Sequence, residues 1–292
     1  MVNSTQAQQL RSAVSAKPTK VIAVTSGKGG VGKTNVSTNL SVSLAQRGRD
    51  VMLMDADLSL ANVDVLLGLQ PSSNLANLVK GEATLEDTVV DGPAGIRIVP
   101  ASSGDRTMAD LPQASQAAII TAFSQLERQP DVLIIDTAAG LAENVARFAQ
   151  AAQHALVVVC DEPASITDAY ALMKVFSRDY GINRFHVLSN MSRSRVDGRA
   201  LFEKLLRVTD RFLDVVLVHA GTIPSDGYLK KAVQEQRAVV EAYPDSWSAK
   251  AFSQLAETVD AWKQQHEPSG GLTFFFERLV EEQQKMLGGT RR

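Results

Sequence analysis

The fold of this chain is decided near its start by one glycine-rich stretch, Gly27-Lys28-Gly29-Gly30-Val31-Gly32-Lys33-Thr34. Glycines at this spacing let backbone N–H groups curl around phosphate oxygens, while the lysine and hydroxyl at its end bind the β- and γ-phosphates and Mg²⁺. An apolar run, 21–24, precedes the stretch, and a segment of helical periodicity, 35–46, follows it. The sequence therefore predicts a strand, a phosphate-binding loop and a helix, with the whole loop in contact with the nucleotide. A glycine-rich turn matching by chance would not explain the flanking pattern.

Apolar runs of strand length recur along the chain at 21–24, 51–54, 96–99, 132–135, 155–160, 185–188 and 214–218. Segments of helical periodicity separate most of these runs. Continuously apolar strands are buried on both faces, which is typical of a parallel sheet. We therefore predict an α/β fold, a mostly parallel twisted sheet with helices on both faces and with functional loops at the carboxyl ends of its strands.

Composition fits one large α/β domain, since the 292 residues are 45% hydrophobic and 21% charged. The net charge of −2 provides no global attraction to nucleic acid or anionic lipid. The single cysteine, Cys160, ends an apolar run, which favours a buried strand residue in a reducing compartment over a reactive thiol. The polar start of the chain carries no signal region, and no apolar run reaches the roughly 18 residues of a membrane span, so we expect a cytoplasmic protein.

Two breaks of linker composition set the expected domain boundaries. Residues 1–19 are predicted to form a flexible arm, residues 20–265 the nucleotide-binding domain, and residues 266–292 a linker with an amphipathic C-terminal helix.

Carboxylates follow two of the predicted strands at the point where each ends. Asp55 and Asp57 follow the run 51–54, and Asp136 follows the run 132–135. In ATPases with such a loop a strand-end carboxylate holds Mg²⁺ directly or through water, and we assign that role to Asp136 together with Thr34. Asp55 and Asp57 alternate along an extended chain, so we expect Asp55 to support Mg²⁺ hydration and Asp57 to position attacking water. The alternative for each is a helix cap.

Residues Lys28 to Thr34 also match the signature K-G-G-x-G-K-[ST], which has a lysine beyond the one that an ordinary phosphate-binding loop needs. In this respect the chain resembles the deviant Walker A family of MinD- and ParA-type ATPases. The stretches 55–68 and 160–172 look most like the branch of that family that regulates flagellar number and placement. The resemblance covers residues 20–287.

The resemblance implies a slow, Mg²⁺-dependent ATPase that forms a homodimer on ATP. Lys28 lies too near Lys33 to be needed on the same phosphate face; supplied in trans, it would neutralise charge on the partner's triphosphate as an arginine finger does. Lys33 would act on the phosphates, Asp57 would activate water, and Asp136 would belong to the second nucleotide-sensing switch. The segment 162–168 would contribute to the dimer or partner surface.

The adenine site implied by the resemblance combines Asn190 with a loop that includes Pro224, Ser225 and Asp226. The family's loop usually ends in tyrosine, aspartate and glutamate, whereas Ser225-Asp226-Gly227 stands here. Backbone groups are therefore expected to hold the base, more than the side chains of Ser225 and Asp226. Taken alone, Asn190 would be a turn residue.

The C-terminal segment carries an apolar stripe at helical spacing, which we expect to touch a membrane or partner through Phe274, Phe275, Phe276, Leu279, Val280, Met286 and Leu287. By resemblance this would be a membrane-targeting helix on inner-membrane lipid. Two copies in a dimer would bind by avidity, about 10²–10⁴ above one copy, so membrane residence would depend on ATP. The alternative is permanent packing on the protein's own core.

The N-terminal arm contains Gln6, Ala7, Leu10 and Arg11, which resemble the element by which this branch stimulates the GTPase FlhF. Thr5 stands where that element has aspartate. A segment of this kind would fold on its partner. The alternative is a structureless leader.

Two classes of function follow. In the first, an ATP-dependent switch cycles on the cytoplasmic face of the inner membrane, at the cell pole in one version. It would limit flagellar number by acting on FlhF, on a transcription activator of the FleQ or FlrA type, and on a flagellar switch (C-ring) protein. In the second, a ParA-like partition ATPase binds DNA without sequence preference. The near-neutral charge makes direct DNA binding the weaker expectation, since the only compact basic cluster is Arg193, Arg195 and Arg199. A metabolic P-loop enzyme, a third class, would leave the apolar tail unexplained.

Overall fold

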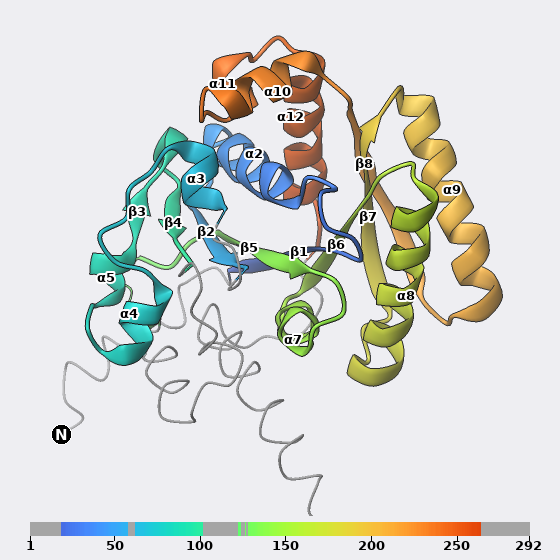
Figure 1. Cartoon of the computed structure of the whole chain (residues 1–292), viewed down its shortest axis with the longest axis horizontal. Coiled ribbons are helices and arrows are strands. Elements are labelled where there is room, and N and C mark those ends of the chain that lie inside the picture. Colours follow the sequence, from blue (N-terminus) through green and yellow to red (C-terminus); the bar gives the residue numbers. More distant parts are fainter. Residues whose placement is uncertain (1–18, 58–61, 102–121, 124–125, 127, 264–292) are drawn as a thin grey trace, which may run out of the picture.

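A computed structural model describes residues 19–57, 62–101, 122, 123, 126 and 128–263. Within them, eight strands form one sheet in the order β3-β4-β2-β5-β1-β6-β7-β8 (Figure 1). The strands are β1 (Lys20–Ser26), β2 (Val51–Ala56), β3 (Val90–Asp91), β4 (Arg97–Val99), β5 (Val132–Ala139), β6 (His154–Val159), β7 (Arg184–Ser192) and β8 (Val216–Pro224). Every pairing is parallel except that of β3 with β4, so the predicted mostly parallel sheet is confirmed.

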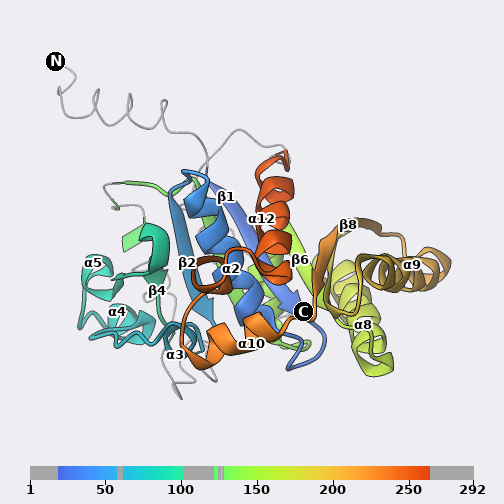
Figure 2. The same cartoon turned by 90° about the horizontal axis from the view of Figure 1, so that it is seen from above.

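Helices cover both faces of the sheet, as predicted (Figures 1 and 2). One face packs against α2 (Lys33–Gln46) and α12 (Trp247–Asp260), with α10 (Gly227–Gln234) and α11 (Val239–Ala242) beside them. The other packs against α7 (Glu143–Ala151), α8 (Pro163–Tyr180) and α9 (Arg195–Phe212). Near β3 and β4 lie the short helices α3 (Val63–Leu67), α4 (Leu75–Lys80) and α5 (Leu85–Thr88) and the 3₁₀ turn η1 (Pro93–Gly95).

The central strand β1 shows why the apolar runs are continuous. Ile22 and Val24 join the core cluster of α2 and α12, whereas Ala23 joins that of α7 and α8. Successive side chains of a strand point to opposite faces. Because helices cover both faces, consecutive positions in the middle of the strand, 21–24, are all apolar.

Several strands run further than their apolar runs predict, mainly at the carboxyl end. β5 continues to Ala139 and β7 to Ser192, and β8 spans Val216–Pro224 where 214–218 was expected. The polar residues there stay in register with neighbouring strands, as Asp55 does with Asp136. Backbone hydrogen bonds with the neighbouring strands extend these strands. The polarity of the side chains does not reveal such pairing.

Within the described part of the chain, no helix is long and apolar enough to cross a membrane. The arm residues Gln6, Ala7, Leu10 and Arg11 lie outside the described residues, as does the apolar tail stripe from Phe274 to Leu287. Their predicted roles stay predictions.

Candidate nucleotide-binding site

The phosphate-binding loop joins β1 to α2, as the sequence predicts. Gly32 is the N-cap of α2, with a left-handed φ of 86°. Its carbonyl accepts the first helical hydrogen bond from Val36 N at 3.0 Å. The free N–H groups and positive dipole end of α2 then lie at the end of the loop, beside Lys33 and Thr34, where an anion is best stabilised.

Gly27 has a role that the sequence does not suggest. A Cβ atom at this position would lie 2.2 Å from the carbonyl oxygen of Asp168 in α8. The first glycine of the loop therefore allows α8 to approach the loop backbone closely. By contrast, a Cβ at Gly29 or Gly30 would meet open space, which leaves that part of the loop free to surround a ligand.

Asp136 and Thr34, two of the predicted Mg²⁺ ligands, lie together. Asp136 is buried, and its Oδ1 accepts a hydrogen bond from Ser37 Oγ at 2.8 Å; the Thr34 side chain also bonds to it. Burial raises the pKa of Asp136 to about 6, although these hydrogen bonds and the nearby charge of Lys33 oppose the rise. A buried carboxylate beside a hydroxyl and a lysine is a donor set that fits Mg²⁺ with phosphate.

Ser37 was missed at the sequence level. It lies one turn after Thr34 on α2, so a hydroxyl at that spacing points the same way. That spacing is the signal that could have found it.

Asp55 organises the loop that follows β2. Its Oδ1 accepts a hydrogen bond from Asp57 N at 3.0 Å, and its Oδ2 accepts from Asn62 N at 2.9 Å and Val63 N at 3.2 Å. Burial, and then the charge of Asp136, raise its pKa to about 7. The capping alternative thus describes the observed contacts of Asp55, and its support of Mg²⁺ hydration stays a prediction. Asp57 is half-buried at the mouth of this loop.

Asn190, at the carboxyl end of β7, reaches the phosphate-binding loop. Its Nδ2 donates to Val31 O at 2.7 Å, and a Cβ at Gly32 would lie 2.7 Å from the same nitrogen. Its Oδ1 is buried and has no hydrogen-bond partner in the structure. A buried acceptor without a partner is costly unless a ligand satisfies it. The exocyclic amine of adenine is a donor of the required kind.

The second half of the predicted base site lies beside the end of β7. Ser225 N donates to Ser192 O at 2.8 Å, which places Pro224 and Ser225 beside the chain that follows Asn190. Asp226 is the N-cap of α10, and its carboxylate accepts from Tyr228 N and from both Ser248 N and Ser248 Oγ, each at 2.9 Å. The Asp226 side chain therefore fixes the starts of two helices. That backbone groups hold the base stays a prediction.

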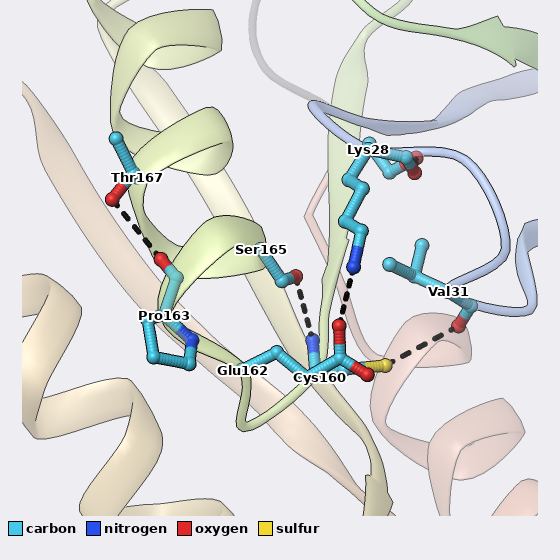
Figure 3. Close-up of polar contacts among 8 residues, drawn as sticks. Lys28, Val31, Cys160, Glu162, Pro163, Ser165 and Thr167 are labelled. Atoms are coloured by element: carbon cyan, nitrogen blue, oxygen red, sulfur yellow. Dashed lines mark hydrogen bonds and ion pairs between the residues drawn. The ribbon is translucent and has the colours of Figure 1, made fainter.

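Lys28 lies apart from the residues that surround the presumed phosphates. Its Nζ is paired with the Glu162 carboxylate at the start of α8, and 37% of its side chain is exposed (Figure 3). The hydrogen bond that Lys28 donates to the Glu162 carboxylate raises the pKa of Lys28. The sequence assigned the segment from Glu162 to a surface, but not to a contact with Lys28.

Two further contacts hold the start of α8 in place beside the loop. Cys160 N donates to Ser165 Oγ at 3.0 Å, and Cys160 Sγ lies 3.7 Å from Val31 O (Figure 3). Cys160 is buried, as predicted.

Comparison with known proteins agrees with this site. Residues 17–260 match the model of the ParA family, described as "NUBPL iron-transfer P-loop NTPase". The chain is 56% identical over 264 residues to the antiactivator FleN of Pseudomonas aeruginosa, which covers 90% of this chain and 94% of that protein. It is 31% identical over 267 residues to the flagellum site-determining protein YlxH of Helicobacter pylori, covering 90% of each chain.

A solved structure shows the same architecture with a nucleotide bound. The septum site-determining protein MinD of Pyrococcus horikoshii, complexed with Mg-ADP, superposes with a TM-score of 0.65 at 27% identity. The alignment covers 83% of this chain and 96% of that one.

Proposed function

This chain belongs to the ParA family of P-loop NTPases and to its FleN group, and on that premise we propose that it is an ATP-driven switch that limits flagellar number and placement. As a MinD-like member of the family it is an ATPase that uses ATP and Mg²⁺. The flagellar role comes from its relatives, since FleN is named an antiactivator and YlxH a flagellum site-determining protein. The site supports the role because it combines a complete phosphate loop with a second lysine, Lys28, at its exposed rim.

Bound Mg²⁺ would offset the negative charge of the ATP phosphates. Lys33 and the start of α2 would bind the phosphates, and Asp136, oriented by Ser37, would hold the metal. Asp55 accepts a hydrogen bond from the backbone N–H of Asp57, so it would help to position the Asp57 carboxylate that orients water. Asn190 offers its unpartnered Oδ1 to the base.

The dimer forms when Lys28 of each protomer reaches the nucleotide of the other. Two nucleotides then hold two protomers together, and hydrolysis removes that stabilisation. Dimerisation also places two C-terminal stripes on one particle. We propose that this doubled anchor keeps the ATP form on the inner membrane and lets the ADP form return to the cytoplasm.

The proposed targets of the switch are two flagellar regulators and the motor's switch (C-ring) protein. The arm around Gln6 to Arg11 would stimulate the GTPase FlhF, and the dimer would restrain a transcription activator of the FleQ or FlrA type. The name antiactivator given to FleN supports the second target. Neither interaction needs the chain to bind DNA.

Liposome co-sedimentation of the full chain tests the proposal, with ATP or with ADP, beside a DNA-binding assay. The matched variants are a deletion from Leu272 onward and Phe275→Glu, and Lys28→Ala serves as a dimerisation control. Pelleting that needs ATP, Lys28 and the tail is expected. ATP-dependent DNA binding without pelleting would instead favour a partition ATPase.

A further inference from the structure

Two large aromatic side chains are exposed at the rim of the base site. Trp247, the first residue of α12, is 79% exposed, and Tyr228, in the first turn of α10, is 53% exposed. Both flank Asp226, whose carboxylate fixes the backbone at Tyr228 and Ser248. Tryptophan and tyrosine are enriched among the residues that carry protein-binding energy, and an isolated tryptophan is seldom this exposed on an ordinary surface.

The rim continues on the neighbouring loop. Met191 is 48% exposed and Val196 is 77% exposed. Arg195 Nη2 donates to Gln254 Oε1 at 2.8 Å, which ties the start of α9 to α12. Gln254 lies nearly two helical turns after Trp247, so both side chains lie on the same face of α12, roughly 10 Å apart. We call the set Met191, Val196, Tyr228 and Trp247 the base-rim surface.

The charges beside the base-rim surface are unbalanced. Arg193 and Lys230 are exposed, and neither has an acidic partner among the described residues. In the part of the chain that the structure describes, the nearby carboxylates of Asp197 and Asp226 accept hydrogen bonds only from neutral groups and keep their charge, whereas Asp245 is paired with Lys250. Arg195 donates to a neutral amide, so Arg193, Arg195 and Lys230 outnumber the two unpaired carboxylates. The net charge at the rim is therefore positive, which complements a carboxylate-rich ligand.

We propose that the base-rim surface is a docking site for an acidic segment of a partner protein that carries an aromatic or aliphatic anchor. The anchor packs between Trp247 and Val196, and the segment's carboxylates pair with Arg193 and Lys230. Nucleic acid fits this surface less well, because phosphate tracking needs a row of cations and gains little from exposed aliphatic groups. The docking proposal rests on the residues of the rim and does not depend on the membrane cycle. Experiments can therefore refute the docking proposal and the membrane-cycle proposal separately.

Docking here acts on nucleotide exchange. The base-rim surface is built on the two loops that carry Asn190 and Pro224, and those loops are joined by the Ser225–Ser192 hydrogen bond. A segment bound across both loops holds them closed over the base. Nucleotide release then slows, and ATP strengthens partner binding by the same factor, which is typically about 5-fold or more for coupled sites.

The probe is a fluorescein-labelled peptide of glutamate and aspartate residues with a central leucine-phenylalanine pair. It is titrated by anisotropy with the full chain in Mg²⁺·ATP. Binding should weaken about 10-fold or more in Trp247→Ala and in Arg193→Glu. Trp247→Phe should retain binding, which separates loss of contact from misfolding. Phe212→Ala, at an apolar position that is 62% exposed at the far end of α9, should bind as the unchanged protein does.

Release of fluorescent ATP is measured with and without the peptide, and slower release is the expected result. Equal binding of a peptide with serine in place of the acidic residues would overturn the charge argument. Binding of a DNA oligomer with the same dependence on Trp247 and Arg193, without peptide binding, would reassign the surface to nucleic acid. Peptide binding only after deletion of residues 264–292 would make the chain's own tail the occupant. Absence of binding to any probe would overturn the proposal.

Discussion

Lys28 Nζ is paired with the Glu162 carboxylate of its own protomer, across the gap between the phosphate-binding loop and α8. The partner's nucleotide, on which Lys28 is proposed to act, must therefore compete with Glu162. The ion pair therefore raises the ATP concentration that is needed before two protomers associate.

Glu162→Ala should lower that concentration. Both groups are more than one-third exposed, and exposed ion pairs contribute little stability, so the dimer should form at only about 1.5- to 5-fold lower ATP concentration. Sedimentation velocity across an ATP titration measures the effect. Asp161→Ala is the matched control, because it removes a neighbouring pair with Lys204 and leaves Lys28 untouched. A Glu162→Ala protein that needs more ATP than the control would contradict the competition.

Asp57→Ala should stop hydrolysis and leave nucleotide binding intact. General-base groups contribute roughly 10²–10⁴-fold, so turnover should fall by that factor while the ATP-bound dimer accumulates. Asp55→Ala should behave differently, because three backbone donors lose their acceptor and the loop after β2 loses its anchor. Phosphate release and dimer fraction, measured on both variants, distinguish the two carboxylates. Loss of ATP affinity in Asp57→Ala would refute its assigned role.

Asn190→Ala should weaken ATP binding and reduce the preference for adenine over guanine. The variant removes both the unpartnered Oδ1 and the hydrogen bond to Val31 O. Loss of a buried polar partner costs about 1–3 kcal/mol, or roughly 5- to 150-fold in affinity. Competition of ATP and GTP against a fluorescent analogue measures it. Ser192→Ala, which removes a buried hydroxyl with no protein partner on the same strand, should change neither affinity.

Stability of the nucleotide-free protein should depend on pH through Asp55. Its pKa is raised from 3.8 to about 7, so the folded state keeps a proton that the unfolded chain has lost. The stability of the folded state is therefore fully present below about pH 4, where Asp55 is neutral in both states, and is progressively lost as the pH rises through about 7. The Tm of the unchanged protein minus that of Asp55→Asn should decrease between pH 5 and about pH 8. A difference that is constant or increases would contradict the raised pKa.

Mg²⁺ binding should release protons over the same range. The metal requires an ionised Asp136, whose pKa is about 6 in its absence. The affinity for Mg²⁺·ADP should therefore rise between about pH 5 and pH 7. Calorimetry in two buffers of different ionisation enthalpy gives the number of protons released.

Lys20→Ala should destabilise the fold without changing nucleotide binding. Lys20 Nζ donates to the last carbonyls of α12, Val259 O at 2.8 Å and Asp260 O at 2.9 Å. Two acceptors lose their partner, so the free energy of unfolding should fall by about 1–3 kcal/mol. Urea denaturation measures the loss, and Lys174→Ala at an exposed position of α8 should stay within about 0.5 kcal/mol.

The elements that sequence alone located are those whose signal is local. The phosphate-binding loop is contiguous from Gly27 to Thr34. The apolar residues of β1, and likewise those of β5, predict that the strand is buried on both faces. The carboxyl ends of parallel strands meet at one edge, so Asp55 and Asp136 could be assigned to one site before their contacts were known, whereas Asn190 was assigned to it only by the family resemblance.

Contacts between distant residues carried no such signal. Lys28 and Glu162 are separated by 134 positions, and the sequence around neither residue predicts a contact with the other. The closeness of Gly27 to Asp168 and the double capping by Asp226 likewise depend on how three helices pack. Pattern and propensity constrain single elements, while such pairings depend on the fold as a whole.

The lone thiol of this chain is a reporter of its motion. Cys160 lies under α8 with its sulfur against Val31, and burial raises its pKa to about 11. A covered, neutral thiol reacts with an alkylating reagent only while it is transiently uncovered. Because the sequence has no second cysteine, the increase in intact mass on alkylation would time the separation of α8 from the phosphate loop without any engineered label.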